Sequence, residues 1–334
     1  MAGDQMHAEV SDGARPISIH AGDGVVLGGT RFEPFAEARS QVLVLGATAV
    51  PQRYYAPFAA YLARAGHRVV TFDYRGIGDS RPDSLVGFRA RMADWARKDA
   101  VAALETTRAF DNTLPTFLVG HSFGGQSLGL APELREVDGA FLVASQLGYL
   151  GHWPSALERA RLFMILYGAL PVASNAFGYL PGWLGLKHDL PKGVALEWAK
   201  WCRHPDYLGG YEDDADQNFA SFRAPISLVS VTDDDMAPAR SVRALVRRLR
   251  NAPLVHDRVA PADVGADHIG HFGFFRPKFR DSLWRLGPAF FDDVLGGRTP
   301  RRAFRRPLGR PTLSDLIDLR EEDLMSDLGY GRPS

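Results

Sequence analysis

Short apolar runs, separated by polar turns that contain glycine, recur along most of the chain. Eight of these runs fit β-strands: residues 17–20, 25–32, 41–45, 68–73, 116–120, 140–144, 226–231 and 254–260. Five of them are dense in Val, Leu, Ile or Phe without strict alternation, which indicates strands covered on both faces. The first two carry polar residues and glycines, so we expect them to form an antiparallel edge of the sheet.

Helical periodicity fills several of the gaps between these runs. Apolar residues at i, i+3, i+4 and i+7 are Phe58, Tyr61, Leu62 and Ala65 in one segment and Val242, Leu245, Val246 and Leu249 in another. Each set forms one apolar stripe along a helix. Strands joined by such helices predict right-handed βαβ crossovers and a mainly parallel sheet, which is an α/β architecture.

The strand–helix alternation stops between about residues 147 and 222 and then resumes. We therefore predict a core formed by residues 15–150 and 223–295, with a helical cap or lid inserted at 151–222. Residues 296–334 contain several arginines and then an amphipathic acidic piece, which predicts a flexible tail. A contact of these arginines with RNA or phosphate is the alternative for the tail.

One stretch of the cap, residues 162–186, has no charged side chain and is long enough to span a bilayer. Gly168, Pro171, Gly178 and Pro181 interrupt it, and a Ser174–Asn175 pair divides it. Such breakers favour a helical hairpin or lid over an isolated spanning helix, so no stable membrane span is expected.

Composition and charge are those of a globular protein. The chain has 39 basic and 39 acidic residues, which gives no overall field suited to nucleic acid or to a membrane surface. The one cysteine, Cys202, excludes an internal disulfide and a cysteine-based metal site. We interpret it as a small buried side chain, with a catalytic thiol as the alternative. Residues 1–15 lack the apolar segment of a signal peptide, so a cytoplasmic location is expected.

The motif Gly120-His-Ser122-Phe-Gly124 follows the apolar run 116–119 and precedes a helix-compatible segment. This G-x-S-x-G pattern in a strand–turn–helix context is typical of a nucleophile elbow, a strained turn that exposes a serine hydroxyl. Gly120 and Gly124 meet the demand for minimal side chains beside the neighbouring strand and helix. The alternatives are a phosphate-binding turn and a plain strand–helix connection, but the sequence holds no G-x-x-x-x-G-K-[ST] motif.

A serine nucleophile needs an imidazole base and an acid that orients it, and the order with this elbow is Ser, Asp or Glu, His. Three aspartates follow the run 226–231, and counting back four residues from Pro238 selects Asp234, with Asp235 next. Asp233 and Asp235 are otherwise interpreted as solvated or helix-capping groups. After residues 254–260, His271 lies between glycines and aromatic residues and is the predicted base. His268 is interpreted as a surface or structural residue, and His121 as a residue that packs or hydrogen-bonds in the elbow.

The oxyanion of an acyl-transfer intermediate needs two N–H donors. The backbone N–H of Phe123 is the predicted first donor. Gly46 permits a close approach of the loop after residues 41–45, so the N–H of Ala47 is the predicted second donor, with Thr48 as the alternative.

These features together resemble the α/β-hydrolase superfamily, in its serine-aminopeptidase-like and monoglyceride-lipase-like branch. The loop at residues 73–80, the elbow, Asp234 and His271 match by position and order. Residues 46–55, 189–193 and 269–275 are similar to a bacterial family of α/β-hydrolases without an assigned substrate. The resemblance covers roughly residues 15–295 and implies an eight-stranded, mostly parallel sheet flanked by helices, with a helical cap insertion.

The predicted function is that of a cofactor-free serine hydrolase. Aromatic side chains of the cap favour a carboxylic ester with an apolar acyl or alcohol part, and the predicted substrate-binding residues are Tyr54, Tyr55, Phe272 and Trp153. An amidase, peptidase or acyltransferase on the same triad is the first alternative, and a non-catalytic binding protein is the second. No metal and no nucleic acid is expected, and the sequence does not indicate an oligomeric state.

Overall fold

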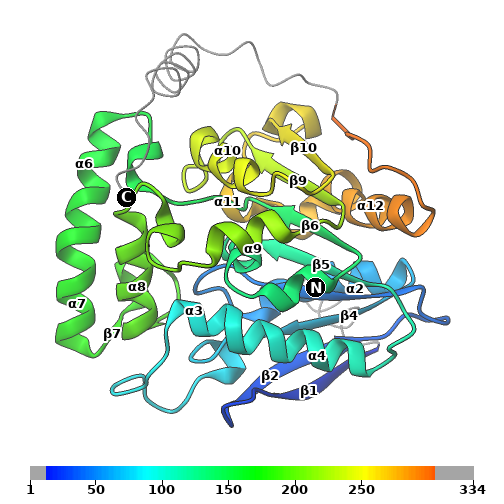
Figure 1. The fold of residues 1–334 in the computed structure, drawn as a ribbon, viewed down its shortest axis with the longest axis horizontal. Helices are drawn as coiled ribbons and strands as arrows, with labels where there is room; N and C mark the ends of the chain where they lie inside the picture. The colour runs from blue at the N-terminus through cyan, green and yellow to red at the C-terminus, as the bar shows by residue number, and fades with distance from the viewer. Residues whose placement is uncertain (1–12, 305–334) are drawn as a thin grey trace, which may run out of the picture.

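The computed structural model describes residues 13–304, and these residues build one eight-stranded sheet with helices on both faces (Figure 1). The predicted tail lies largely outside them. The strands in spatial order are β1 (Ala14–His20), β2 (Val26–Phe32), β4 (His67–Phe72), β3 (Ser40–Leu45), β5 (Thr116–His121), β6 (Gly139–Val143), β9 (Ile226–Val231) and β10 (Leu254–Val259).

Strand direction follows the sequence pattern. β1 pairs antiparallel with β2, and β2 pairs antiparallel with β4, whereas the strands from β4 to β10 are all parallel. Each of the eight predicted strands is present, and its bounds agree within three residues. The α/β-hydrolase fold and its antiparallel edge are therefore confirmed.

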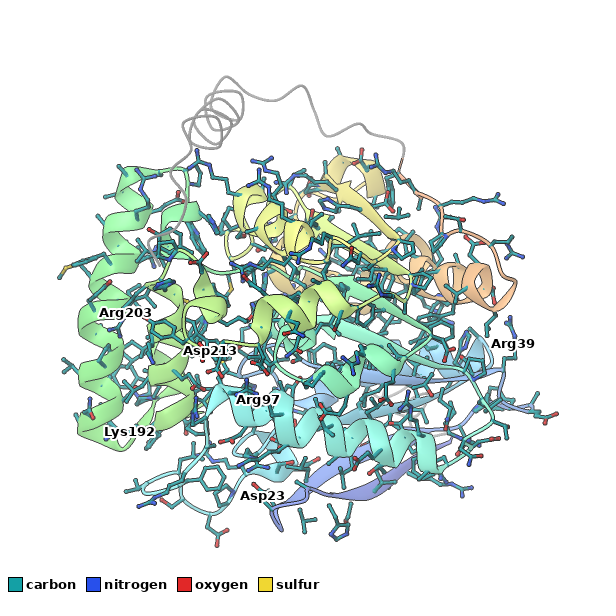
Figure 2. The ribbon with its side chains drawn as sticks, viewed as in Figure 1. Asp23, Arg39, Arg97, Lys192, Arg203 and Asp213 are labelled. Carbon is teal, nitrogen blue, oxygen red and sulfur yellow. The ribbon has the colours of Figure 1, made fainter. Side chains whose placement is uncertain are left out.

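The sheet is buried on both faces because its side chains alternate between two hydrophobic cores. In β3, Val42 and Val44 point to one core, and Leu43 and Leu45 point to the other. Side chains of the helices on both faces of the sheet fill the space against the strands (Figure 2). The first core is covered by α2 (Ala56–Arg64) and α12 (Leu286–Leu295), and the second by α4 (Val101–Ala109), α9 (Ala215–Ser221) and α10 (Ala239–Arg248).

The chain between β6 and β9 leaves the sheet and forms mostly helices. These elements are α6 (Ala156–Met164), a π-helical turn (Ile165–Ala169), α7 (Leu170–Phe177), the two-stranded pair β7 (Tyr179–Leu180) and β8 (Leu190–Pro191), α8 (Lys192–Cys202) and then α9. In Figure 1, α6, α7 and α8 stand at the left edge of the molecule, where α8 lies between the sheet and the column formed by α6 and α7, whereas α9 lies against the sheet. We call α6, the π turn, α7 and α8 the cap helices.

Residues 162–186, for which the sequence favours a helical hairpin or lid, turn only after the helix has ended at Gly178. Ala156–Phe177 is one continuous helix, which by length and composition could cross a membrane. Gly168 and Pro171 do not end it, because the π-helical turn Ile165–Ala169 accommodates the proline at the second position of α7. The helix ends at Gly178, which adopts the left-handed conformation with φ +78°.

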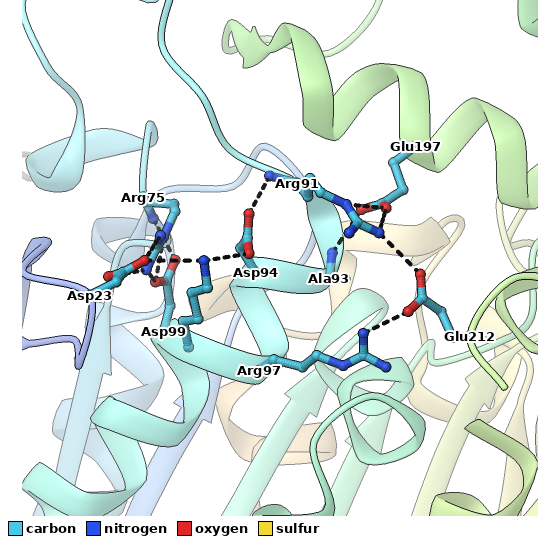
Figure 3. Close-up of polar contacts among 10 residues, drawn as sticks. Asp23, Arg75, Arg91, Ala93, Asp94, Arg97, Asp99, Glu197 and Glu212 are labelled. Carbon is cyan, nitrogen blue, oxygen red and sulfur yellow. Dashed lines mark hydrogen bonds and ion pairs between the residues drawn. The ribbon is translucent and has the colours of Figure 1, made fainter. Parts of the chain in front are cut away.

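One side of the cap is fastened to the core by ion pairs (Figure 3). Glu197 of α8 accepts hydrogen bonds from Arg91 Nε at 2.8 Å and from the backbone N–H of Ala93 at 2.9 Å. Glu212, which follows α8, is buried and accepts from Arg97 at 2.7 Å. Arg91 precedes α3 (Met92–Asp94), and Arg97 lies in the π-helical segment that continues it. Because α8 is held in this way, it forms the fixed inner layer of the cap.

Candidate active site

Ser122 occupies the sharp turn between β5 and α5 (Phe123–Gln126). Its backbone has φ +51° and ψ −107°, a combination that is costly for a residue with a side chain. The turn is held because the Ser122 N–H donates to the carbonyl of Val143 on β6 at 2.9 Å. A Cβ at Gly120 would lie 2.9 Å from the nitrogen of Gly125, and one at Gly124 would overlap the carbonyl of Leu45. The elbow therefore needs both glycines, as the motif predicts.

The predicted acid and base are in contact. His271 Nδ1 lies 2.8 Å from Asp234 Oδ2 and 3.0 Å from Oδ1, and both side chains are buried. Asp234 Oδ1 also accepts from the N–H groups of Met236 and Ala237 at 2.9 Å each, which fixes the carboxylate. A carboxylate on Nδ1 selects the imidazole tautomer in which Nε2 can accept a proton.

Asp233, interpreted from the sequence as a solvated or capping group, holds the backbone of the loop before His271. Its carboxylate accepts the N–H of Ile269 at 2.9 Å and that of Gly270 at 3.2 Å, directly before His271. Burial acts to raise the pKa of Asp233, but these hydrogen bonds and the neighbouring His268 lower it below its ordinary value. The two adjacent aspartates thus have different contacts: Asp233 binds the backbone of the loop, and Asp234 binds the imidazole ring of His271. A run of three aspartates carries no periodicity that distinguishes these roles.

His121 connects the elbow to the loop of the predicted base. Its ring lies 5.3 Å from the ring of His271 between centroids, and its Nε2 lies 3.0 Å from the backbone carbonyl of His271. On its other side, Nδ1 lies 2.8 Å from the hydroxyl of Tyr55. Burial, followed by the nearby His271, lowers the pKa of His121 well below its ordinary value, so the ring is neutral. A neutral ring that accepts at Nδ1 and donates at Nε2 satisfies both contacts.

The prediction for Ala47 needs correction. Its N–H donates to the hydroxyl of Tyr55 at 2.8 Å, in a buried position, so it is not available to an oxyanion in this structure. The contact forms because the Tyr55 ring packs directly on Gly46, where a Cβ would lie 3.1 Å from the ring. No hydrogen bond from the N–H of Thr48 or of Phe123 is present within residues 13–304. These two groups remain as the predicted donors.

The prediction of Tyr55 as a substrate-binding residue is also wrong. Its side chain is 1% exposed, and its hydroxyl bridges Ala47 and His121, so it is part of the core. Burial raises its pKa well above the ordinary value. Spacing along the chain does not show which ring of the adjacent tyrosines Tyr54 and Tyr55 faces inward.

Three other predicted substrate-binding residues surround the same loops. Phe272 is half-buried and packs edge-on against His271, with ring centroids 5.0 Å apart. The Tyr54 hydroxyl donates to the carbonyl of Phe272. The Trp153 indole N–H, at the start of the cap, donates to the carbonyl of Asp235 at 2.8 Å. An apolar side chain therefore lies beside the imidazole, and the cap begins on the loop that carries Asp234.

Two alternatives from the sequence have clear positions in the structure. His268 is exposed and pairs with Asp233 at 2.7 Å, in agreement with a surface role. Cys202 is buried, and burial raises the pKa of its thiol to about 12, so the thiol stays protonated.

Within the described part of the chain, no group of three or more His, Cys, Asp or Glu side chains could hold a metal ion.

Comparison with known structures gives the same fold. An esterase of Pyrococcus furiosus matches over 87% of this chain and 94% of its own, with 16% identity and a TM-score of 0.55. A thermostable carboxyl esterase of Bacillus coagulans matches over 84% and 99%, with 15% identity and a TM-score of 0.56. The search of curated proteins found no match.

The family model described as "Alpha/beta hydrolase family" matches residues 41–279, which include the elbow, the Asp234 loop and His271. This match extends over most of the chain and agrees with the strand order and the elbow geometry. The chain therefore belongs to the alpha/beta hydrolase family.

Proposed function

We propose that this protein is a serine hydrolase that cleaves a carboxylic ester with an apolar acyl or alcohol part. The observation that carries the proposal is the Asp234–His271 hydrogen bond, with the ring of His271 5.3 Å from that of His121, the residue directly before a serine held at φ +51°. A buried carboxylate that orients an imidazole, next to a strained serine turn, is the arrangement that activates a hydroxyl for acyl transfer. The half-buried Phe272 against His271 supports an apolar group at this position.

The residues have these roles in the proposed reaction. His271 Nε2 takes the proton of the Ser122 hydroxyl as Oγ attacks the ester carbonyl, while Asp234 stabilises the imidazolium that forms. The imidazolium then protonates the departing alcohol and leaves an acyl-enzyme. Water attacks this intermediate with His271 again as the base. The N–H of Phe123, at the start of α5, and the N–H of Thr48 stabilise the negative oxygen in both steps.

A fluorophosphonate probe tests the proposed nucleophile. Because a triad-activated serine reacts with the probe, the native protein is expected to be labelled and the Ser122→Ala variant is expected not to be. The matched control is Ser127→Ala, which removes a buried hydroxyl one helical turn further along the chain. Labelling of Ser122→Ala at the native level, or no labelling of the native protein, would refute the assignment.

A substrate panel tests the ester. Aryl esters with short and long acyl chains are compared with the corresponding aminoacyl amides at equal concentrations. We expect kcat/KM for esters to exceed that for amides and to rise with acyl length, because a longer chain buries more apolar surface beside Phe272. Faster cleavage of the amides would replace the ester proposal by an amidase on the same residues.

A further inference from the structure

The outer face of the cap helices carries apolar side chains that nothing in the described structure covers. Ala156–Phe177 is 22 residues long, which corresponds to about 33 Å of helix. Along it, Leu157, Met164 and Val172 are 79%, 68% and 67% exposed. Ile165, Tyr167 and the last residue of the helix, Phe177, are exposed as well, and the 75% exposed Trp183 continues the surface beyond the helix. We call these residues the cap face.

The opposite side of the same helix belongs to the protein core. Leu166, Leu170 and Ala173 are buried in the hydrophobic cluster that includes α8, and α8 is itself fastened to the core through Glu197. Only 22% of the most apolar window of the helix is buried. A helix packed along one side on a fixed neighbour cannot leave to span a bilayer, but its other side can lie in the plane of an interface.

The charges around the cap face have one predominant sign. Residues 162–186 contain no charged side chain, and the exposed cations Arg161 and Lys187 flank this stretch. Arg203 stacks on the ring of Tyr167 at 4.6 Å, and Figure 2 places Arg203 and Lys192 near the two ends of α8.

The acidic groups nearby are mostly paired. Asp189 binds Arg81 at 2.9 Å, Asp206 binds Arg248 at 3.4 Å, and Glu197 binds Arg91. Glu158 at the start of α6 and Asp213, which follows α8, are the exposed exceptions. A symmetric contact with a second copy of the chain would bring mainly cations against cations. An apolar strip flanked by cations and aromatic rings instead fits an anionic lipid surface.

We propose that the cap face docks in the plane of an anionic phospholipid surface. Leu157, Met164 and Val172 enter the boundary between headgroups and acyl chains, Trp183 lies at headgroup depth, and Arg161 and Lys187 contact phosphates. This docking is a property of the cap alone and does not depend on the proposed hydrolysis.

The test is flotation of the full-length protein with vesicles of phosphatidylcholine alone and of phosphatidylcholine mixed with phosphatidylglycerol. We expect the native protein to float with the mixed vesicles and to bind them at least about tenfold more tightly than the neutral ones, because each cation near an anionic surface adds to the affinity. Equal or absent binding to both would overturn the proposal.

A matched pair of variants locates the contact. Met164→Glu combined with Val172→Glu places two carboxylates on the cap face, and we expect partitioning to fall at least about 100-fold. The control, Val26→Glu combined with Phe35→Glu, adds the same charge at exposed apolar positions in β2 and in the loop after it. The control should bind like the native protein. Equal losses in both variants would show a general charge effect and refute the cap face as the contact.

Two further measurements separate the outcomes. The Ser122→Ala variant should float like the native protein, so a failure of the hydrolase proposal leaves this result unchanged. The molar mass of the native protein and of the Met164→Glu, Val172→Glu variant is measured by light scattering without vesicles. A native dimer that becomes monomeric in the variant would assign the cap face to self-association and overturn the proposal.

Discussion

The hydroxyl of Tyr55 joins two buried hydrogen bonds, one from Ala47 and one to His121. Its removal measures how much these two hydrogen bonds stabilise the fold. The Tyr55→Phe change keeps the ring on Gly46 but deletes the oxygen that accepts from Ala47 and contacts His121, both at 2.8 Å. A buried polar group left without a partner costs about 1–3 kcal/mol. Because two such groups are orphaned in a position that is 1% exposed, we expect a loss of about 2–6 kcal/mol in the free energy of unfolding.

Urea unfolding followed by circular dichroism measures this loss as a lower transition midpoint with an unchanged slope. The matched control is Tyr61→Phe, which removes a hydroxyl from a half-buried ring and should change the free energy by no more than about 0.5 kcal/mol. Equal midpoints for the two variants would show that the hydroxyl of Tyr55 does not stabilise the fold, and the two hydrogen bonds would then have no energetic role.

Three other changes have defined outcomes. Asp233→Asn weakens the hydrogen bonds that the carboxylate accepts from the loop before His271, so we expect kcat to fall about tenfold with little change in KM. The control, Asp235→Asn, should leave both constants unchanged. Gly124→Ala forces a Cβ into the carbonyl of Leu45 and should prevent accumulation of folded protein, as judged by soluble yield. His67 has its pKa lowered to about 4 by burial, so as pH falls below 6.5 the unfolded chain takes up the proton first and stability is lost towards pH 4. His67→Asn should therefore reduce the drop in unfolding free energy between pH 7 and pH 5 by about 2 kcal/mol, and an unchanged drop would contradict the burial argument.

Much of the fold could be predicted because its signals are local. Buried parallel strands such as β3 and β5 are continuous apolar runs, and Gly120 and Gly124 mark the elbow by their spacing from Ser122. Asp234 and His271 could be nominated from chain order, and the structure brings their side chains into contact.

The parts that sequence could not give depend on contacts between distant residues. Nothing in the local sequence shows that Tyr55 turns inward to meet Ala47 and His121, so both Tyr55 and Ala47 were assigned to roles that the structure excludes. The continuous helix through Pro171 was missed for a different reason. Its π-helical turn is a change in backbone conformation that packing on α8 stabilises, and no residue type in the sequence predicts it.

The chain of contacts from Ala47 through Tyr55 and His121 to His271 also bears on how the protein is made. It joins a loop near the start of the sequence, a turn in the middle and a short helix near residue 270. During synthesis the first strands can pair as they emerge, but the imidazole of His121 keeps an unsatisfied nitrogen until the carbonyl of His271 arrives. A nascent chain that stalls before that point would hold most of its sheet and still lack the contact between His121 and His271.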